Sequence, residues 1–186
     1  MRIVGGSRRG RRLLPPRSSA TRPTADRVRE SLFNVLGQRL AGGEVLDLYA
    51  GTGALALEAL SRGAERAVLV EAAAEAAELC RKNAAALGFE AQAEVLRVRV
   101  ERAVERLERE GRRFALAFAD PPYAARAGGW VVGAVAPLLT ENGTLVVEHD
   151  RREALPEATP TLFRVDQRRF GDTVLSFYRA APAPQP

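Results

Sequence analysis

Between residues 44 and 148, short apolar segments alternate with longer Ala/Leu-rich segments, and few folds accommodate that alternation. The short segments have the length and the Val, Leu and Phe content of buried strands, whereas the longer ones repeat apolar residues at helical spacing. The predicted strands lie near 44–48, 67–71, 93–99, 114–119 and 143–148, and the predicted helices near 53–62, 73–87, 101–110 and 128–139. Strands separated by helices form parallel sheets that helices cover on both faces. The sequence therefore predicts an α/β fold.

Further elements are expected at the two ends of the chain. Arg2-Ile3-Val4 and Leu13-Leu14 are expected to form two short strands of a hairpin, with a turn between them. The spacing of apolar residues predicts a helix that Thr24 caps and Gly37 ends. Two strands near 161–169 and 173–179 are expected to form a hairpin that turns at Gly171-Asp172.

A glycine turn follows the first predicted strand. Gly51 and Gly53 allow the backbone to turn sharply and to approach a ligand closely. The next strand ends at Glu71, where a carboxylate can accept both hydrogen bonds of a ribose diol. This spacing is shared by enzymes that bind nicotinamide dinucleotides and by methyltransferases that use S-adenosylmethionine. Asp47 favours the methyltransferases, because an acid beside the turn suits the ammonium group of a methionine moiety and would repel a pyrophosphate.

The segment Asp120-Pro121-Pro122-Tyr123 follows the fourth predicted strand. The prolines bias the two residues before them to extended backbone, which directs the Asp120 carboxylate and the Pro121 carbonyl toward one small volume. These two acceptors can take both hydrogens of an exocyclic amine, while Tyr123 offers a face on which a base can stack. An ordinary turn has the same residue types, but ligands of such sheets gather where the strand order reverses. Together with the glycine turn, the segment predicts methylation of an amino group on a nucleobase.

Four parts of the sequence carry a resemblance to a known family. They are Arg2-Ile3-Val4-Gly5-Gly6 with Arg9-Gly10-Arg11, Arg22-Pro23-Thr24-Ala25-Asp26-Arg27-Val28-Arg29-Glu30, Asp47-Leu48-Tyr49-Ala50-Gly51-Thr52-Gly53 and Asp120-Pro121-Pro122-Tyr123. Over nearly its whole length the chain resembles the ribosomal RNA guanine-N2 methyltransferases, which modify one guanine of the small-subunit RNA. The resemblance implies a Rossmann-like class I methyltransferase fold with a seven-stranded, mostly parallel sheet, helices on both faces and a C-terminal β-hairpin whose last strand is antiparallel.

The same resemblance implies S-adenosylmethionine as the cofactor, with no metal. The residues it assigns to catalysis are Asp120, Pro121, Pro122 and Tyr123. The residues it assigns to cofactor binding are Thr24, Asp47, Tyr49, Gly51, Thr52, Gly53, Glu71, Ala72, Arg102 and Asp120. Relatives usually carry Asp or Asn after the third strand to meet the adenine amino group. This chain has Val100-Glu101-Arg102-Ala103 there, so Glu101 or backbone atoms would have to make that contact.

Positive charge is concentrated in the first 39 residues. They hold ten arginines against Asp26 and Glu30, a net charge of +8, which leaves −3 for the remainder of a chain whose total is +5. We therefore expect a basic N-terminal extension (1–39) that contacts RNA, a methyltransferase domain (40–180) and a disordered tail (181–186). The arginines expected to bind RNA are Arg8, Arg9, Arg11, Arg12, Arg22 and Arg27.

Composition excludes several other classes. No apolar run approaches about eighteen residues and no signal-peptide pattern is visible, so the sequence predicts neither membrane insertion nor secretion. Cys80 is the single cysteine, which precludes an internal disulfide, and we expect it to pack within a helix in a cytoplasmic protein. With His149 the single histidine, a zinc site or a histidine-based triad would lack its usual residues.

The expected activity is methylation of the N2 amine of one guanine in small-subunit ribosomal RNA by a monomeric enzyme, within an assembling or assembled ribosomal particle. Two alternatives remain open. The Asp-Pro-Pro-Tyr segment suits the N6 amine of adenine equally well, so the choice of guanine depends on the resemblance. A non-catalytic RNA-binding assembly factor would also carry the basic extension, although it would not need Asp47, Glu71 or Asp120.

Overall fold

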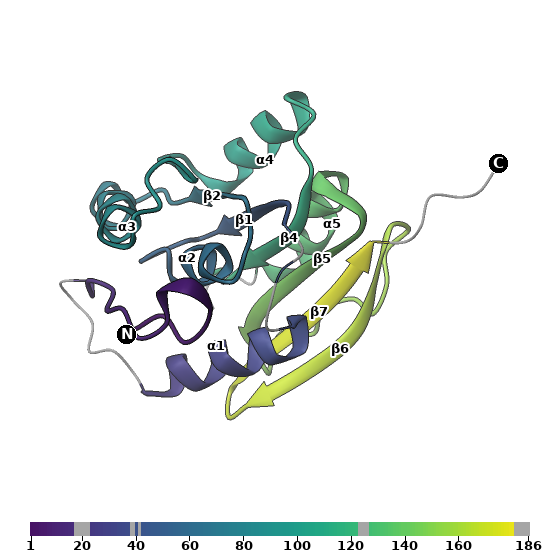
Figure 1. The fold of residues 1–186 in the computed structure, drawn as a ribbon. Helices are drawn as coiled ribbons and strands as arrows, with labels where there is room; N and C mark the ends of the chain where they lie inside the picture. Colours follow the sequence, from purple (N-terminus) through teal and green to yellow (C-terminus); the bar gives the residue numbers. More distant parts are fainter. Residues whose placement is uncertain (17–22, 38–39, 41, 123–126, 181–186) are drawn as a thin grey trace. The chain divides into compact units, whose positions relative to one another are not determined.

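The computed structural model describes residues 1–16, 23–37, 40, 42–122 and 127–180 (Figure 1). The chain contains two compact units, Met1–Val100 and Glu101–Pro186.

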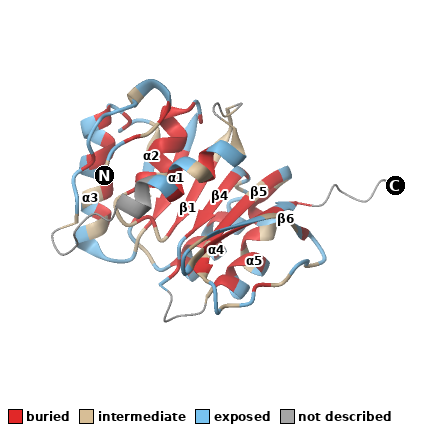
Figure 2. Cartoon of the chain, turned by 90° about the horizontal axis from the view of Figure 1, so that it is seen from below, coloured by how far each residue is buried: buried red, intermediate tan, exposed pale blue. Residues whose placement is uncertain are grey.

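The first unit is built on three parallel strands. They are β1 (Glu44–Leu48), β2 (Arg66–Val70) and β3 (Ala93–Leu96), in the spatial order β3-β2-β1. The helices α2 (Ala54–Ser61) and α3 (Ala74–Leu87) connect them, and α1 (Pro23–Leu36) precedes them. All but the first residues of β1 and β2 are buried, as expected for Val/Leu-rich strands that are covered on both faces. Figure 2 shows the buried residues of β1 in red, together with those of the adjoining helix α2.

Residues 1–16, here called the arm, fold back on themselves before α1 begins. Ile3 N–H donates to Arg11 O at 2.9 Å and Gly10 N–H to Ile3 O at 2.8 Å, around a short 3₁₀ turn, η1 (Gly6–Arg8). The two short strands predicted here are reduced to a single antiparallel bridge between Arg2 and Arg12. The arm is thus an ordered loop that the backbone closes.

A buried carboxylate holds the arm to α2. Glu58, which is fully buried, accepts a hydrogen bond from Val4 N–H at 2.8 Å and one from Arg62 Nε at 2.9 Å, and it lies 3.7 Å from Arg29 Nε. Gly5 allows the close approach, because a Cβ there would lie 2.3 Å from Arg62 Nη2. Removing one of these partners would leave the buried charge of Glu58 without compensation, and such a loss typically costs about 3–5 kcal/mol. The arm is therefore an integral part of the first unit.

The second unit contains all of α4 (Val100–Arg109) except its first residue, and the remaining four strands. These are β4 (Phe114–Ala119), β5 (Leu139–Asp150), β6 (Leu162–Phe170) and β7 (Thr173–Ala180), in the spatial order β4-β5-β7-β6. The helix α5 (Gly128–Val135) and the 3₁₀ turn η3 (Ala136–Leu138) lead into β5. Strands β4 and β5 are parallel, while β7 is antiparallel to both of its neighbours. The predicted C-terminal hairpin and its antiparallel last strand are confirmed.

Several predicted boundaries differ from those observed. Strand β3 ends at Leu96, whereas a strand to residue 99 was expected. The helix α1 begins at Pro23, so the expectation that Thr24 caps it is wrong; proline is well suited to a first helical position because its missing N–H would have no helical partner there. The helix α5 ends at Val135, before Pro137, whereas a helix to residue 139 was expected. Strand β5 starts at Leu139 rather than at 143, because it continues through the irregular Asn142, whose φ is 60°.

Candidate functional site

The turn after β1 has the backbone that its glycines were expected to provide. Tyr49, Gly51 and Gly53 have φ values of 65°, 56° and 77°, and Gly53 N–H closes the turn on Ala50 O at 2.7 Å. A Cβ at Gly53 would lie 2.8 Å from Leu69 Cδ2, and other residues rarely adopt its φ of 77°, so this position favours glycine. A Cβ at Gly51 would meet no atom nearer than Tyr49 O at 4.0 Å, so the outer side of the turn is open to a ligand.

Glu71 fixes this turn from the end of β2. Its Oε2 accepts a hydrogen bond from Gly51 N–H at 3.0 Å, and its Oε1 accepts one from Ala73 N–H at 2.8 Å. The side chain is half-buried, so the carboxylate keeps an accessible side. Each carboxylate oxygen can accept more than one hydrogen bond. Glu71 therefore positions the turn and retains capacity for a further donor such as a hydroxyl group.

Asp47 is a buried acid on β1, only 2% exposed. Its Oδ2 accepts a hydrogen bond from Ala56 N–H at 3.1 Å. Burial, and secondarily the charge of Glu71, raises the pKa of Asp47 to about 7, although the Ala56 hydrogen bond opposes this rise. A cationic ligand group near Asp47 would favour its charged form. This set of acceptors fits S-adenosylmethionine, which carries an ammonium group and a ribose diol.

Side chains from α3 and the arm also hold the turn. Asn83, fully buried on α3, donates through Nδ2 to Thr52 O at 2.9 Å, and its Oδ1 accepts from Leu14 N–H at 2.7 Å. Thr52 Oγ1 donates to the Met1 sulfur at 3.4 Å. Sequence reasoning missed Asn83 and Met1, because neither belongs to a motif. The available signal was one amide within the Ala-rich helix, where Asn is unfavourable unless it is bonded.

Cys80 lies on α3 directly beneath the turn. It is fully buried, and its thiol donates to Gly51 O at 3.2 Å. Burial, and secondarily the charges of Asp47 and Glu71, raises the pKa of the Cys80 thiol to about 12. The expectation that Cys80 packs within a helix is confirmed, and its thiol is held in the unreactive neutral form.

The second unit carries the other predicted site residues. Asp120 is exposed and directly follows β4, Pro121 is buried and Pro122 is exposed. Tyr123 lies outside the described residues. Arg102, on the exposed side of α4, pairs with Glu105 at 3.1 Å. Ala72 in the first unit is exposed just after β2.

The arginines expected to bind RNA differ in their surroundings. Arg8 Nε donates to Leu87 O at 2.7 Å and its guanidinium lies over the Phe89 ring, 5.2 Å from its centre. Arg11 Nη2 donates to Ala86 O at 3.0 Å, so both side chains bind the C-terminal end of α3. Three others, Arg9, Arg12 and Arg27, are exposed, while Arg22 and the side chain of Thr24 lie outside the described parts of the structure. Their role in binding RNA stays a prediction.

His149 is buried and hydrogen-bonded within the sheet of the second unit, as a structural residue would be. It is buried on β5, its Nε2 lies 2.9 Å from Ser176 Oγ and its Nδ1 lies 3.0 Å from Asp150 O. Gln167 Nε2 also donates to Ser176 Oγ, at 3.0 Å.

Within the described ranges no three His, Cys, Asp or Glu side chains are grouped so as to hold a metal ion. No helix among those residues is both long and apolar enough to span a bilayer.

Comparison with known proteins places this arrangement in a family. The family model described as "Conserved hypothetical protein 95" matches residues 1–179. The chain belongs to this family. YlbH of Bacillus subtilis (strain 168) is 36% identical over 181 residues, 96% of this chain and 98% of that relative. Ribosomal RNA small subunit methyltransferase D of Escherichia coli (strain K12) is 41% identical over 148 residues, 80% of this chain and 71% of that relative.

The fold comparison agrees with the sequence comparison. The structure of YhhF from Escherichia coli has a TM-score of 0.82 at 31% identity and covers 98% of this chain and 99% of that protein. The predicted Rossmann-like class I methyltransferase fold is confirmed, as is the predicted membership of an S-adenosylmethionine-dependent ribosomal RNA methyltransferase family.

Proposed function

We propose that this enzyme transfers a methyl group from S-adenosylmethionine to the exocyclic N2 amine of one guanine in small-subunit ribosomal RNA. The observation that carries the proposal is the buried Asp47 beside an open glycine turn that Glu71 fixes. A carboxylate whose pKa burial raises to about 7 is costly to keep charged, and a cationic ligand would offset that cost.

In this proposal the first unit binds the cofactor. Asp47 accepts hydrogen bonds from the ammonium group and Glu71 from the ribose hydroxyls, while Gly51 and Gly53 let the backbone lie close to the ligand. Thr24, Tyr49, Thr52 and Ala72, together with Arg102 and Asp120 of the second unit, complete the proposed set of contacts. Bound S-adenosylmethionine supplies a methyl group that its sulfonium already activates. The protein therefore has mainly to position the two reactants and to stabilise the transition state electrostatically.

Asp120 and the Pro121 carbonyl act on the base. A guanine amine is a weak nucleophile because its lone pair is delocalised into the ring. Two acceptors that take its hydrogens turn the lone pair toward the methyl group and ease pyramidalisation at nitrogen. Tyr123 would stack on the base, an interaction worth about 1–3 kcal/mol. Because pairing hides this amine, the target guanine must be unpaired or flipped out.

The name of the Escherichia coli relative, ribosomal RNA small subunit methyltransferase D, supports small-subunit RNA as the substrate. We further propose that the enzyme acts as a monomer, in the cytoplasm, on an assembling or assembled ribosomal particle and without a metal. Methylation of adenine N6 is the competing outcome, since Asp120 and Pro121 suit either amine.

Calorimetry with the purified protein tests the cofactor assignment. We expect binding of S-adenosylmethionine and S-adenosylhomocysteine and no binding of NAD. Glu71→Ala should weaken cofactor binding by about 1–3 kcal/mol, roughly tenfold or more in affinity, because the ribose loses its acceptors and Gly51 N–H loses its partner. Tight NAD binding without binding of S-adenosylmethionine would refute the proposal.

A further inference from the structure

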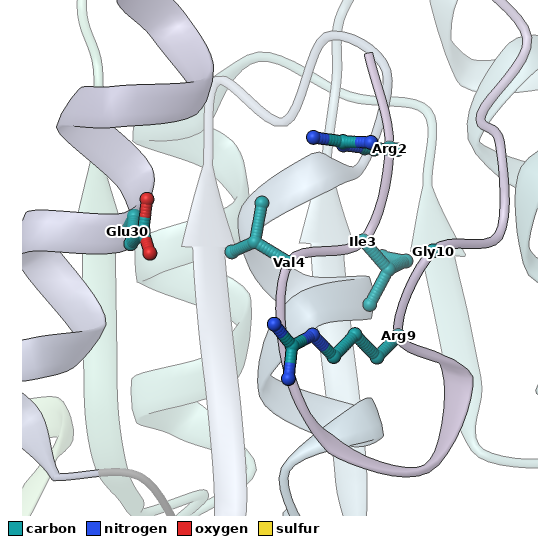
Figure 3. Close-up of a pocket in the computed structure, with 6 residues that line it drawn as sticks. All are labelled: Arg2, Ile3, Val4, Arg9, Gly10 and Glu30. Atoms are coloured by element: carbon teal, nitrogen blue, oxygen red, sulfur yellow. The ribbon is translucent and has the colours of Figure 1, made fainter.

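A cavity of about 190 Å³ lies between the arm and α1, wholly within the first unit (Figure 3). It is lined by Arg2, Ile3, Val4, Arg9, Gly10 and Glu30. The volume is below the roughly 300–1,000 Å³ of sites for drug-sized ligands, so it suits a single planar group. We call it the arm cavity.

Backbone and buried contacts fix the walls of the arm cavity. Arg29 Nη2 donates to Arg2 O at 2.5 Å, and Val4 N–H donates to the buried Glu58 at 2.8 Å. Ile3 is fully buried and forms an apolar part of the lining. Gly10 has φ +82°, and a Cβ at this position would meet no atom within 4 Å. The arm cavity is therefore a preformed space with an open side at Gly10.

Three charged side chains surround this space. Figure 3 shows Glu30 on α1 facing Val4 and Arg2 across the cavity, with the Arg9 guanidinium below Val4. All three charged side chains are exposed. Among ion pairs between described residues, none within 4.0 Å joins Glu30 to Arg2 or Arg9. The guanidinium groups and the carboxylate are thus available to a ligand that carries both a negative charge and hydrogen-bond donors.

We propose that the arm cavity binds one unpaired guanine nucleotide of the RNA substrate, separate from the guanine that is methylated. This inference rests on the proposed action on RNA. The N1–H and N2–H groups of guanine are adjacent donors that match the two oxygens of the Glu30 carboxylate. Adenine, cytosine and uracil offer no such adjacent pair of donors. Arg2 and Arg9 bind the flanking phosphates, since a guanidinium fork matches phosphate oxygens.

The arm cavity therefore gives the extension a role in sequence recognition as well as in electrostatic attraction. Phosphate contacts orient a protein on RNA, whereas contacts with base edges distinguish one sequence from another. Glu30 would be the group that selects guanine.

Titration of the isotope-labelled full chain with guanosine 5′-monophosphate, followed by amide NMR, tests this site. We expect the Val4 and Gly10 amides to shift with guanosine monophosphate and much less with the adenosine, cytidine and uridine monophosphates. Glu30→Gln keeps the side-chain shape but replaces one acceptor with a donor, and it should weaken the guanosine response about threefold to tenfold. No shift at these amides, or equal shifts with all four nucleotides, would overturn the proposal.

Arg9→Gln and Arg12→Gln form a matched pair, because both remove one exposed positive charge from the arm but only Arg9 lines the cavity. We expect Arg9→Gln to weaken binding of guanosine monophosphate and Arg12→Gln to leave it nearly unchanged. Equal effects of the two substitutions would show that the nucleotide is held only by general charge attraction, and this would contradict the assignment.

Binding of S-adenosylmethionine and methyl transfer to ribosomal RNA, measured on the same variants, separate this inference from the proposed function. If the wild-type protein transfers no methyl group but Glu30 still selects guanosine monophosphate, the proposed function fails and the cavity assignment stands. If methylation proceeds and the cavity amides do not respond, the cavity assignment alone fails.

Discussion

Asp47 is a buried acid whose charged form lowers the stability of the ligand-free protein, and we propose that a cationic cofactor offsets this cost. Its ordinary pKa of 3.8 is raised to about 7 in the folded protein, mainly by burial. Between these two values the folded state binds more protons than the unfolded state, so the contribution of Asp47 to stability falls as the pH rises from about 4 to about 7. Above pH 7 the protein without ligand bears the full cost of a buried charge.

Asp47→Asn should therefore stabilise the ligand-free protein at pH 8, by at most about 4 kcal/mol, because one pKa unit corresponds to about 1.4 kcal/mol. The amide oxygen can still accept from Ala56 N–H, so the helix start is kept. The same variant should bind S-adenosylmethionine more weakly, because it lacks the negative charge that we propose for binding the ammonium group. Urea unfolding at pH 4 and pH 8, together with calorimetry, measures both effects. A variant that is less stable than wild type at pH 8 would contradict this account.

At the level of elements, the glycine turn is supported from three directions, namely β2, α3 and the arm. Glu71, Asn83 and Met1 contact Gly51 or Thr52 from these elements. Since Asn83 also bonds the Leu14 backbone, it joins the arm to the turn. The conformation of the glycine turn therefore depends on the arm.

Asn83→Asp tests this connection, because it keeps the acceptor for Leu14 N–H but removes the donor to Thr52 O. We expect severalfold weaker S-adenosylmethionine binding and a lower melting temperature, since an unsatisfied buried carbonyl costs about 1–3 kcal/mol. Glu78→Gln, an exposed change on the same helix, is the control and should alter neither. Unchanged cofactor affinity in a folded Asn83→Asp protein would show that the turn does not need α3.

Substitutions of the arm arginines should have two different effects, one on stability and one on RNA binding. Arg8→Gln with Arg11→Gln should lower the melting temperature, because these side chains bind carbonyls at the end of α3. Arg9→Gln with Arg12→Gln should leave stability unchanged and weaken RNA binding. The slope of log affinity against log salt should then fall by about 0.7–0.9 for each phosphate that the protein no longer neutralises. Filter binding over a salt series and thermal melts distinguish the pairs, and an unchanged slope for Arg9 and Arg12 would move RNA binding elsewhere on the protein.

Local signals account for what could be predicted from the sequence at this level. The glycine turn, the order of strands and helices and the hairpin at Gly171-Asp172 each depend on residues close together in the chain, and each is confirmed. The roles of Glu58 and Asn83 could not be predicted, because their partners are 54 and 69 residues away in the chain. Strand β5 was expected too short because Asn142-Gly143 has the composition of a turn.

For the molecule as a whole, the basic arm and the acids beside the glycine turn differ in charge, as the two proposed ligands do. The first 39 residues, which include the arm, carry a net charge of +8 against −3 for the remainder of the chain, which suits a polyanionic substrate. Asp47, a buried acid, and Glu71 beside it instead suit the cationic cofactor that we propose. The family model matches residues 1–179, so the arm and the turn both lie within the part of the chain that the family shares.

Mass spectrometry of nucleosides tests the central claim most directly. Small-subunit particles, and separately their naked RNA, are incubated with the enzyme and isotope-labelled S-adenosylmethionine, then digested completely. We predict labelled N2-methylguanosine with the wild-type enzyme. With Asp120→Ala we predict a loss of at least about a hundredfold, while cofactor affinity stays near that of the wild type, because removal of a group that acts in the transition state lowers turnover. Labelled N6-methyladenosine, no labelled nucleoside, or near-normal turnover by Asp120→Ala would contradict the account.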